Sequence, residues 1–265
     1  MLRVIALVAV IVCGAAAVWY YRGAIQTSSP TTADTVEQDA WLDHLYSANP
    51  GEVEAATAQV KTMGLAALPV IHATFQDPSA APERVKAALK ACGILGPAAA
   101  PALGEVAEQL PDPTLTAEAA LALSFMGRGA FGPLRDAFRS DDPVVRREAL
   151  RSIGKLKERA PLDARAVLPL LIKGTADPDP GVRAVAATYL GIVQEGGAEV
   201  VQALITGLGD PEVDVRRASA AALGSFGEQA AVAVPALRKA AGDADPEVAR
   251  EAGVSLVKLQ AKKRP

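Results

Sequence analysis

The stretch Asp142–Gly154, DPVVRREALRSIG, sets the pattern of this 265-residue chain, because close variants of it recur. It returns at Asp179–Gly191 as DPGVRAVAATYLG, at Asp210–Gly224 as DPEVDVRRASAAALG, and truncated at Asp245–Leu256 as DPEVAREAGVSL. Each copy carries an arginine, and the four arginines are 37, 33 and 34 residues apart: Arg146, Arg183, Arg216 and Arg250. A period in this range is typical of stacked helical hairpins, not of one globular core.

Each copy also has the features of a helix with a defined start. Asp142 can cap the helix, and Pro143 suits its first turn. Val145 and Ala149 then follow at helical spacing on one face. In the three complete copies a glycine is predicted to end the helix in a left-handed conformation, namely Gly154, Gly191 and Gly224, and Gly93 matches them earlier in the chain.

The composition favours an all-α fold. Hydrophobic residues make up 50% of the chain and aromatic residues only 4%, a mixture that suits close-packed helices better than strands. We expect a solenoid of about six to seven helical hairpins over residues 35–260, followed by a basic tail at 261–265.

The chain resembles HEAT-repeat proteins in its Asp-Pro turn, its Val-Arg pair, its row of alanines and its Leu-Gly pair. It is most similar to the HEAT-like repeats of the phycobilin-lyase type, over about Asn49 to Leu256. The resemblance implies a right-handed α-solenoid whose second helices line a concave surface that binds other proteins. Such kinship predicts fold far better than function.

The N-terminus predicts a membrane segment. Val4 to Tyr21 is an uncharged run of 18 residues, long enough to cross most of a bilayer as a helix. Residues 1–22 are therefore a transmembrane anchor or, since Ala15 and Ala17 form a small-x-small site, a cleaved signal segment. Residues 23–34 are predicted to form a flexible linker. The charges around the run favour repeats on the extracytoplasmic (periplasmic) side. If the segment is cleaved, the chain would instead be secreted.

No catalytic or metal-binding constellation is visible in the sequence. Of the two histidines, His44 lies near Asp43, and His72 has no cysteine or acid at ligand spacing, so three or four converging ligands are not visible. The two cysteines, Cys13 and Cys92, form no disulfide framework. We therefore expect no enzyme activity, no metal and no cofactor. The net charge of −3 opposes nucleic-acid binding.

Two sets of basic residues stand out. The repeated arginines are predicted to form a structural ladder along the stack, with aspartates at the start of each copy as partners. That set comprises Arg146, Arg183, Arg216, Arg250, Asp142, Asp179 and Asp210. A second, less regular set is predicted to form either a basic concave ridge for an acidic protein partner or a solvated charged face. It comprises Lys86, Lys90, Arg147, Arg151 and Arg217.

These features favour a membrane-tethered, non-catalytic scaffold that binds a protein partner on its concave face. The membrane contact would be through residues 4–21, and the sequence does not indicate the oligomeric state. Two alternatives remain. The resemblance implies a bilin lyase-like or chaperone-type HEAT protein, for which no pigment pocket is evident. The basic ridge and tail favour a binder of anionic lipid.

Overall fold

The computed structural model describes residues 39–160 and 162–261. Within these ranges all regular secondary structure is helical, as the composition predicted. The predicted anchor or signal segment at 1–22, the linker at 23–34 and the end of the basic tail lie outside the described residues. The chain divides into two units, Met1–Trp41 and Leu42–Pro265. A short helix, α3 (Ala40–His44), is the first described element, and the repeats all belong to the second unit.

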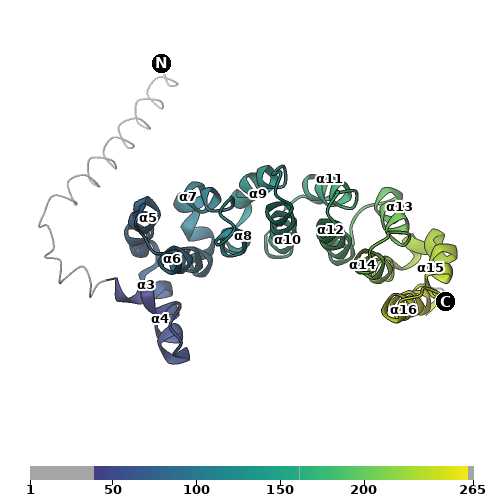
Figure 1. Cartoon of the computed structure of the whole chain (residues 1–265), viewed down its shortest axis with the longest axis horizontal. Helices are drawn as coiled ribbons and strands as arrows, with labels where there is room; N and C mark the ends of the chain where they lie inside the picture. Colours follow the sequence, from purple (N-terminus) through teal and green to yellow (C-terminus); the bar gives the residue numbers. More distant parts are fainter. Residues whose placement is uncertain (1–38, 161, 262–265) are drawn as a thin grey trace, which may run out of the picture. The chain divides into compact units, whose positions relative to one another are not determined.

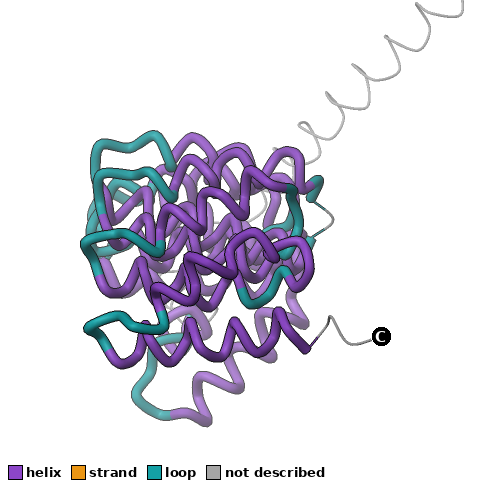
Figure 2. Tube along the Cα trace, turned by 90° about the vertical axis from the view of Figure 1, so that its right-hand side faces the viewer, coloured by secondary structure: helices purple, strands orange, loops and turns teal. Residues whose placement is uncertain are grey.

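The second unit is a solenoid of two rows of helices (Figure 1). The outer row lies on the convex side of the arc and comprises α5 (Leu68–Gln76), α7 (Leu103–Glu108), α9 (Phe131–Ala137), α11 (Ala164–Gly174), α13 (Ala198–Gly207) and α15 (Val234–Ala240). The inner row lies on the concave side and comprises α4 (Pro50–Met63), α6 (Pro82–Leu95), α8 (Thr116–Phe125), α10 (Pro143–Arg159), α12 (Pro180–Val193), α14 (Val213–Leu223) and α16 (Pro246–Ala261). Figure 2 shows loops stacked along one edge of the unit.

Proline and aspartate fix where the inner helices begin. Five of the seven start with proline, which needs no hydrogen-bond partner for its nitrogen in the first turn. Asp142 caps α10 by accepting a hydrogen bond from the Val144 N–H at 2.8 Å, and Asp179 caps α12 in the same way through Val182. The start of the repeat is thus encoded locally.

Short 3-10 turns lead into several outer helices: η1 (Gly64–Ala67), η2 (Gly96–Ala102), η3 (Arg128–Ala130) and η4 (Gly227–Ala233). Gly96 and Gly227 have positive φ angles of 58° and 56°. Glycine is the residue that adopts this conformation without steric cost. These turns reverse the chain between the inner helix and the outer helix that follows.

The predicted left-handed glycine C-caps are wrong, although Gly224 does end its helix. Gly93, Gly154 and Gly191 lie inside α6, α10 and α12, and Gly224 has an ordinary helical φ of −63°. At Gly154, Gly191 and Gly224 the physical reason for glycine is close packing, whereas a Cβ on Gly93 would make only ordinary contacts, the nearest at 3.6 Å. A Cβ on Gly191 would come within 2.7 Å of the Ala222 Cα on the next inner helix. The missing side chain lets neighbouring inner helices approach each other.

The core runs continuously between the two rows. It consists mainly of leucine, valine and alanine side chains, such as Leu150, Ile153, Val167 and Leu171, which are fully buried where α10 meets α11. No pair of helices could bury its apolar surface alone, so each pair is covered by its neighbours.

One helical stretch among the described residues, Pro82–Glu108, is long and apolar enough to cross a membrane. It comprises α6, η2 and α7, and the chain turns back at Gly96 between the two α-helices. Ala88 and Cys92 of α6 are fully buried in the solenoid core. The apolar character of this stretch is therefore explained by packing inside the solenoid.

Candidate binding surface

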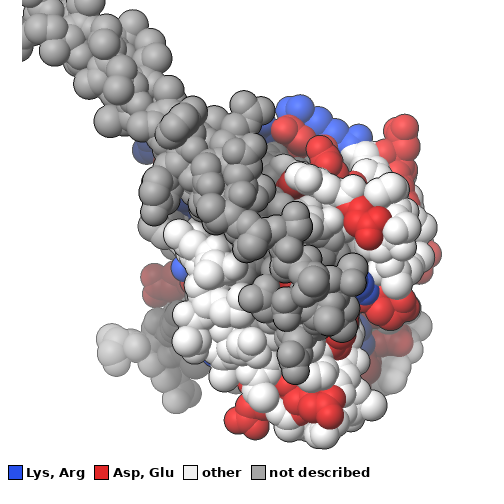
Figure 3. Space-filling model, turned by 90° about the vertical axis from the view of Figure 1, so that its left-hand side faces the viewer, with Lys and Arg blue, Asp and Glu red and all other residues white. Residues whose placement is uncertain are grey.

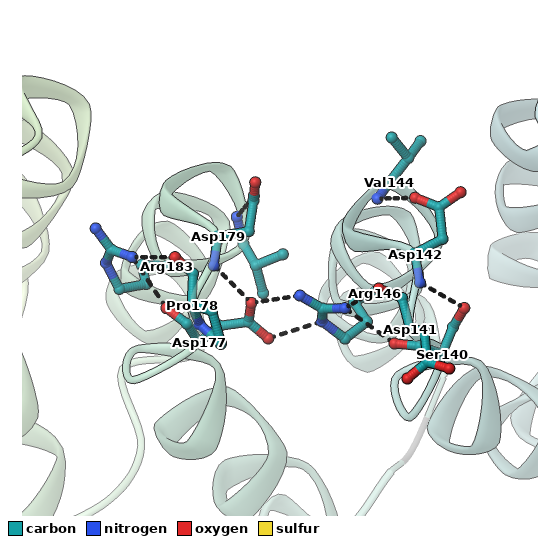
Figure 4. A network of polar contacts seen from close by, with 10 residues as sticks. Ser140, Asp141, Asp142, Val144, Arg146, Asp177, Pro178, Asp179 and Arg183 are labelled. Carbon is teal, nitrogen blue, oxygen red and sulfur yellow. Dashed lines mark hydrogen bonds and ion pairs between the residues drawn. The ribbon is translucent and has the colours of Figure 1, made fainter.

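The repeated arginines join successive repeats through paired hydrogen bonds. Arg146 Nε and Nη2 donate to the two carboxylate oxygens of Asp177 at 2.9 and 2.8 Å, while Nη1 donates to the carbonyls of Ser140 and Asp141 (Figure 4). Arg183 repeats this arrangement with Asp210, and Arg216 repeats it with Asp243. Each arginine thus ties the turn before its own helix to the turn before the next inner helix.

The ladder aspartates also order their own turns. Asp177 accepts the N–H of Asp179 at 2.9 Å, and Asp210 accepts that of Glu212 at the same distance. Burial opposes ionisation of Asp177 and Asp210, but the arginine and backbone hydrogen bonds outweigh it and hold the pKa of each carboxyl below its usual range. For Asp243, the hydrogen bond from Arg216 is the main cause of a lowered pKa.

Two aspartates of the predicted ladder have another role. Asp142 and Asp179 do not pair with the arginines, because their carboxylates cap their own helices. The ladder partners of Arg146 and Arg216 are instead Asp177 and Asp243, which lie two residues before a cap position.

Arg250 also lies outside the ladder. Each ladder arginine stands six residues after the ladder position of its own turn, and six residues after Asp243 comes Ala249. Arg250 is one residue later, which rotates it by about 100° around the helix. It pairs instead with Glu247 and Glu251 on α16.

The predicted basic ridge is divided among separate helices. Lys86 and Lys90 lie on α6, Arg147 and Arg151 on α10, and Arg217 on α14. The intervening α8 contains no lysine or arginine, and the single arginine of α12, Arg183, belongs to the ladder. On the face that Figure 3 shows, the described basic side chains form separate groups. The structure therefore does not bring the five residues together as one continuous ridge.

Each arginine of this set has a carboxylate partner on its own helix. Arg151 Nη1 donates to both oxygens of the buried Glu148 at 2.8 and 2.9 Å, and Arg147 Nε contacts the same carboxylate at 3.4 Å. Arg217 pairs with Asp214 at 2.7 Å. These pairs reduce the positive charge available to an acidic partner, although the guanidinium groups remain partly exposed.

The register of the inner helices follows from their glycine contacts. Gly154 of α10 packs against Tyr189 of α12, and Gly191 of α12 packs against Ala222 of α14. In both pairs the contacted residue lies two positions before the glycine of its own helix: Tyr189 precedes Gly191, and Ala222 precedes Gly224, by two residues. Gly93 packs against Ala122 in the same way, so the equivalent position in α8 is Ser124.

In this register α8 presents apolar side chains where α10 presents basic ones. Leu121 and Phe125 occupy the positions of Arg151 and Lys155, and the same positions in α12 hold Thr188 and Ile192. Leu121, Phe125 and Ile192 are about 40% exposed (44%, 39% and 42%). Because neighbours cover the other sides of each inner helix, these side chains face the concave surface.

A cavity of about 510 Å³ opens between α4, α6 and α8. Its walls include Leu89, Ile94, Leu121 and Phe125, with Tyr46 at one side. Sequence reasoning missed this cleft, since its walls come from segments far apart in the chain. The available signal was the presence of Leu121 and Phe125 at the positions where α10 carries Arg151 and Lys155.

A shallower groove lies at the other end of the concave surface. Small side chains on α12 and α14, including Ala184, Thr188, Ala218 and Ala221, leave a space of about 450 Å³. The ion pairs of Arg217 and the acids of α16 line one end of it. This groove is mixed in polarity, whereas the cleft at α6 and α8 is mainly apolar.

The described residues offer no group of three or more histidine, cysteine or acidic side chains that could hold a metal ion. His72 contacts Glu105 on the outer row, and His44 lies in α3. Burial raises the pKa of the Cys92 thiol to about 12, which suppresses formation of the reactive thiolate.

Comparison with protein families gives the class to which this repeat belongs. The family model described as HEAT repeats matches residues 131–224 and 201–264, together just over half of the chain. The chain belongs to the HEAT-repeat family. The match includes all three Arg–Asp pairs of the ladder.

Several solved structures are similar at low sequence identity. A crystal structure of an engineered protein is 19% identical with a TM-score of 0.48, covering 84% of this chain and 96% of that one. A designed armadillo repeat protein in complex with the peptide (KR)4 is 19% identical with a TM-score of 0.47, covering 83% and 98%. The complex of CpcE and CpcF of phycocyanin lyase from Nostoc sp. PCC7120 is 22% identical with a TM-score of 0.49, covering 58% and 98%. Among curated proteins, no sequence matches this chain.

Proposed function

We propose that this chain is a membrane-tethered, non-catalytic scaffold that binds a protein partner on its concave inner face. The observation that carries the proposal is the row of exposed side chains on the inner helices. α8 exposes Leu121 and Phe125, the neighbouring α10 carries the partly exposed Arg147 and Arg151, and α12 exposes Ile192.

Exposed apolar and arginine side chains on a rigid surface are suited to protein recognition. A contiguous patch of exposed apolar side chains that is rimmed by polar residues often marks an interaction site. Aromatic and arginine residues contribute much of the binding energy in protein interfaces. Both residue types meet at Phe125, because the Arg159 guanidinium lies 4.0 Å from the centre of the Phe125 ring.

The charged groups refine the kind of partner. Glu148 holds Arg151 by two hydrogen bonds and contacts Arg147, so less conformational entropy is lost when these arginines bind. The guanidinium N–H groups that Glu148 does not bind could donate hydrogen bonds to carboxylates of a partner. We therefore propose a partner whose surface combines apolar side chains with scattered acids.

The membrane tether is part of the same proposal. The 18-residue uncharged run Val4 to Tyr21 supports an anchor, and the charges beside it favour repeats on the extracytoplasmic side. Extraction of native membranes with carbonate at high pH would leave an anchored chain in the pellet. Release into the supernatant would instead indicate a cleaved or peripheral protein.

Partner binding is tested by crosslinked pull-down of the full-length chain from native membranes. We expect a defined partner with the wild type, strong loss with Leu121→Asp combined with Ile192→Asp, and partial loss with Arg147→Glu, Arg151→Glu and Arg217→Glu together. The control carries Arg135→Glu and Arg238→Glu on the outer helices α9 and α15. Equal capture by the inner-face and outer-face variants would contradict a concave binding site.

A further inference from the structure

The cleft between α4, α6 and α8 has the composition of a site for one particular kind of ligand. Its volume of about 510 Å³ lies within the range of about 300–1,000 Å³ that is usual for small-molecule sites. Leu89 forms part of its buried wall, while Leu121, Phe125 and Tyr46 remain about 40% exposed at its opening (44%, 39% and 43%). The cleft therefore offers an apolar surface that a ligand could cover.

Two lysines bring positive charge to the edge of this apolar surface. Lys61 of α4 and Lys90 of α6 both line the cleft, and Glu118 of α8 is the single acid among the lining residues. The lining thus carries a net charge of +1 from these three groups. A ligand with one negative charge would balance it.

Lys90 is held in place before any ligand arrives. Its ammonium group donates to the Leu45 carbonyl at 2.8 Å and lies 5.1 Å from the centre of the Tyr46 ring. An ammonium group has three N–H donors, so the Leu45 bond leaves others to meet an anion. Binding would cost little side-chain entropy at this lysine.

We infer that the cleft binds a free amphiphile that has an alkyl chain and a single anionic head, such as a long-chain carboxylate. The alkyl chain would lie against Leu121, Phe125 and Ile94, and the head would lie between Lys61 and Lys90. The cleft shares Leu121 and Phe125 with the proposed protein-binding face, but the inference rests on the cleft and its two lysines and does not depend on that role.

An alkyl chain suits the cleft better than an extended peptide does. A peptide backbone carries an N–H and a C=O at almost every residue, and each costs free energy when buried without a hydrogen-bond partner. Apart from Thr57, Lys61, Lys90 and Glu118, with the Tyr46 hydroxyl at one side, the lining side chains are apolar or glycine. An alkyl chain has no polar groups that need partners.

Photolabelling of the full chain in phosphatidylcholine nanodiscs tests the inference. The probe is dodecanoic acid that carries a diazirine on its chain, and labelled peptides are identified by mass spectrometry. We expect labelling of the peptides that contain Tyr46 or Leu121 to Phe125. Leu121→Asp should abolish this labelling, whereas the control Ile192→Asp, at a similarly exposed position on α12, should leave it unchanged. Circular dichroism of both variants checks that they remain folded.

Two further arms test the head group and the source of the ligand. Lys61→Glu should lower labelling by the acid about threefold to fivefold and leave labelling by the matching diazirine dodecanol unchanged. The same diazirine chain within phosphatidylcholine should label the cleft far less than the free acid. Equal labelling by acid and alcohol, labelling from the phospholipid at the level of the free acid, or labelling spread equally over other exposed apolar residues such as Val232 and Val257 would each overturn the inference.

Discussion

Arg183 and Asp210 form a paired hydrogen bond across two repeats, with Nε 2.7 Å from one carboxylate oxygen and Nη2 2.9 Å from the other. Their side chains are only 15% and 11% exposed. A charge that loses its partner in such a position is poorly solvated, so removal of one member destabilises the fold more than the pair itself contributes.

Arg183→Met should therefore lower the free energy of unfolding by about 2–3 kcal/mol. Arg217→Met is the matched control, since Arg217 pairs with Asp214 on its own helix and its side chain is 48% exposed. It should cost less than about 0.5 kcal/mol. Urea denaturation followed by circular dichroism measures both. Equal costs for the two variants would show that the ladder has no special role.

The ladder also predicts a pH dependence. The pKa values of Asp177, Asp210 and Asp243 are lowered in the folded chain, so their contribution to stability is present above the unfolded pKa of about 3.9 and is lost as pH falls through the folded values. The stability difference between wild type and Asp210→Asn should be largest at neutral pH and should shrink below about pH 4.

Asparagine keeps an oxygen for the Glu212 N–H, so the Asp210→Asn comparison isolates the ionic part of the interaction with Arg183. Asp214→Asn, at a 74% exposed position, is the control and should show little pH-dependent difference. A stability gap for Asp210→Asn that is constant from pH 7 to pH 3 would contradict the assignment.

Close packing of the inner helices predicts opposite outcomes for two glycines. Gly191→Ala would place a Cβ 2.7 Å from the Ala222 Cα, and this backbone contact cannot relax cheaply. We expect a loss of about 1–3 kcal/mol. Gly253, inside α16, has nothing within 4 Å of an added Cβ, so Gly253→Ala should be neutral or stabilising by up to about 1 kcal/mol. Melting temperatures that fall equally in both variants would argue against the packing explanation.

Cys92 should be chemically silent in the folded chain. It is fully buried and its pKa is raised to about 12, so little thiolate forms at neutral pH. In a Cys13→Ser background, iodoacetamide should modify Cys92 only under conditions that unfold the solenoid. Rapid modification under native conditions would mean that α6 opens readily toward solvent.

The helical repeat could be predicted from the sequence because residues at the helix starts mark it locally. Asp142 and Pro143 mark the start of a helix, and both have that role in the structure. The register was harder to read. Asp142 and Gly154 are 12 residues apart, whereas Asp210 and Gly224 are 14 apart, because Asp210 is a ladder residue that stands two positions before the cap Glu212.

The candidate surface was less predictable than the fold. Spacing placed Arg147, Arg151 and Arg217 on the inner helices, but it could not show that Glu148 and Asp214 pair with them. Gly154, Gly191 and Gly224 allow close helix packing, which depends on the neighbouring helix and not on local sequence. The cleft depends on the distance between α4, α6 and α8, and only the three-dimensional structure supplies that distance.

The most direct test of a concave binding surface is position-specific photocrosslinking in the source cells. A photoreactive amino acid replaces Thr188, exposed on the inner helix α12, or Gln202, exposed on the outer helix α13, in the full-length chain. We predict a discrete crosslinked partner from position 188 and none from position 202, with the crosslink weakened by Leu121→Asp combined with Ile192→Asp. A crosslink to the same partner from position 202, or from both positions equally, would contradict the proposal that the concave inner face is the binding site.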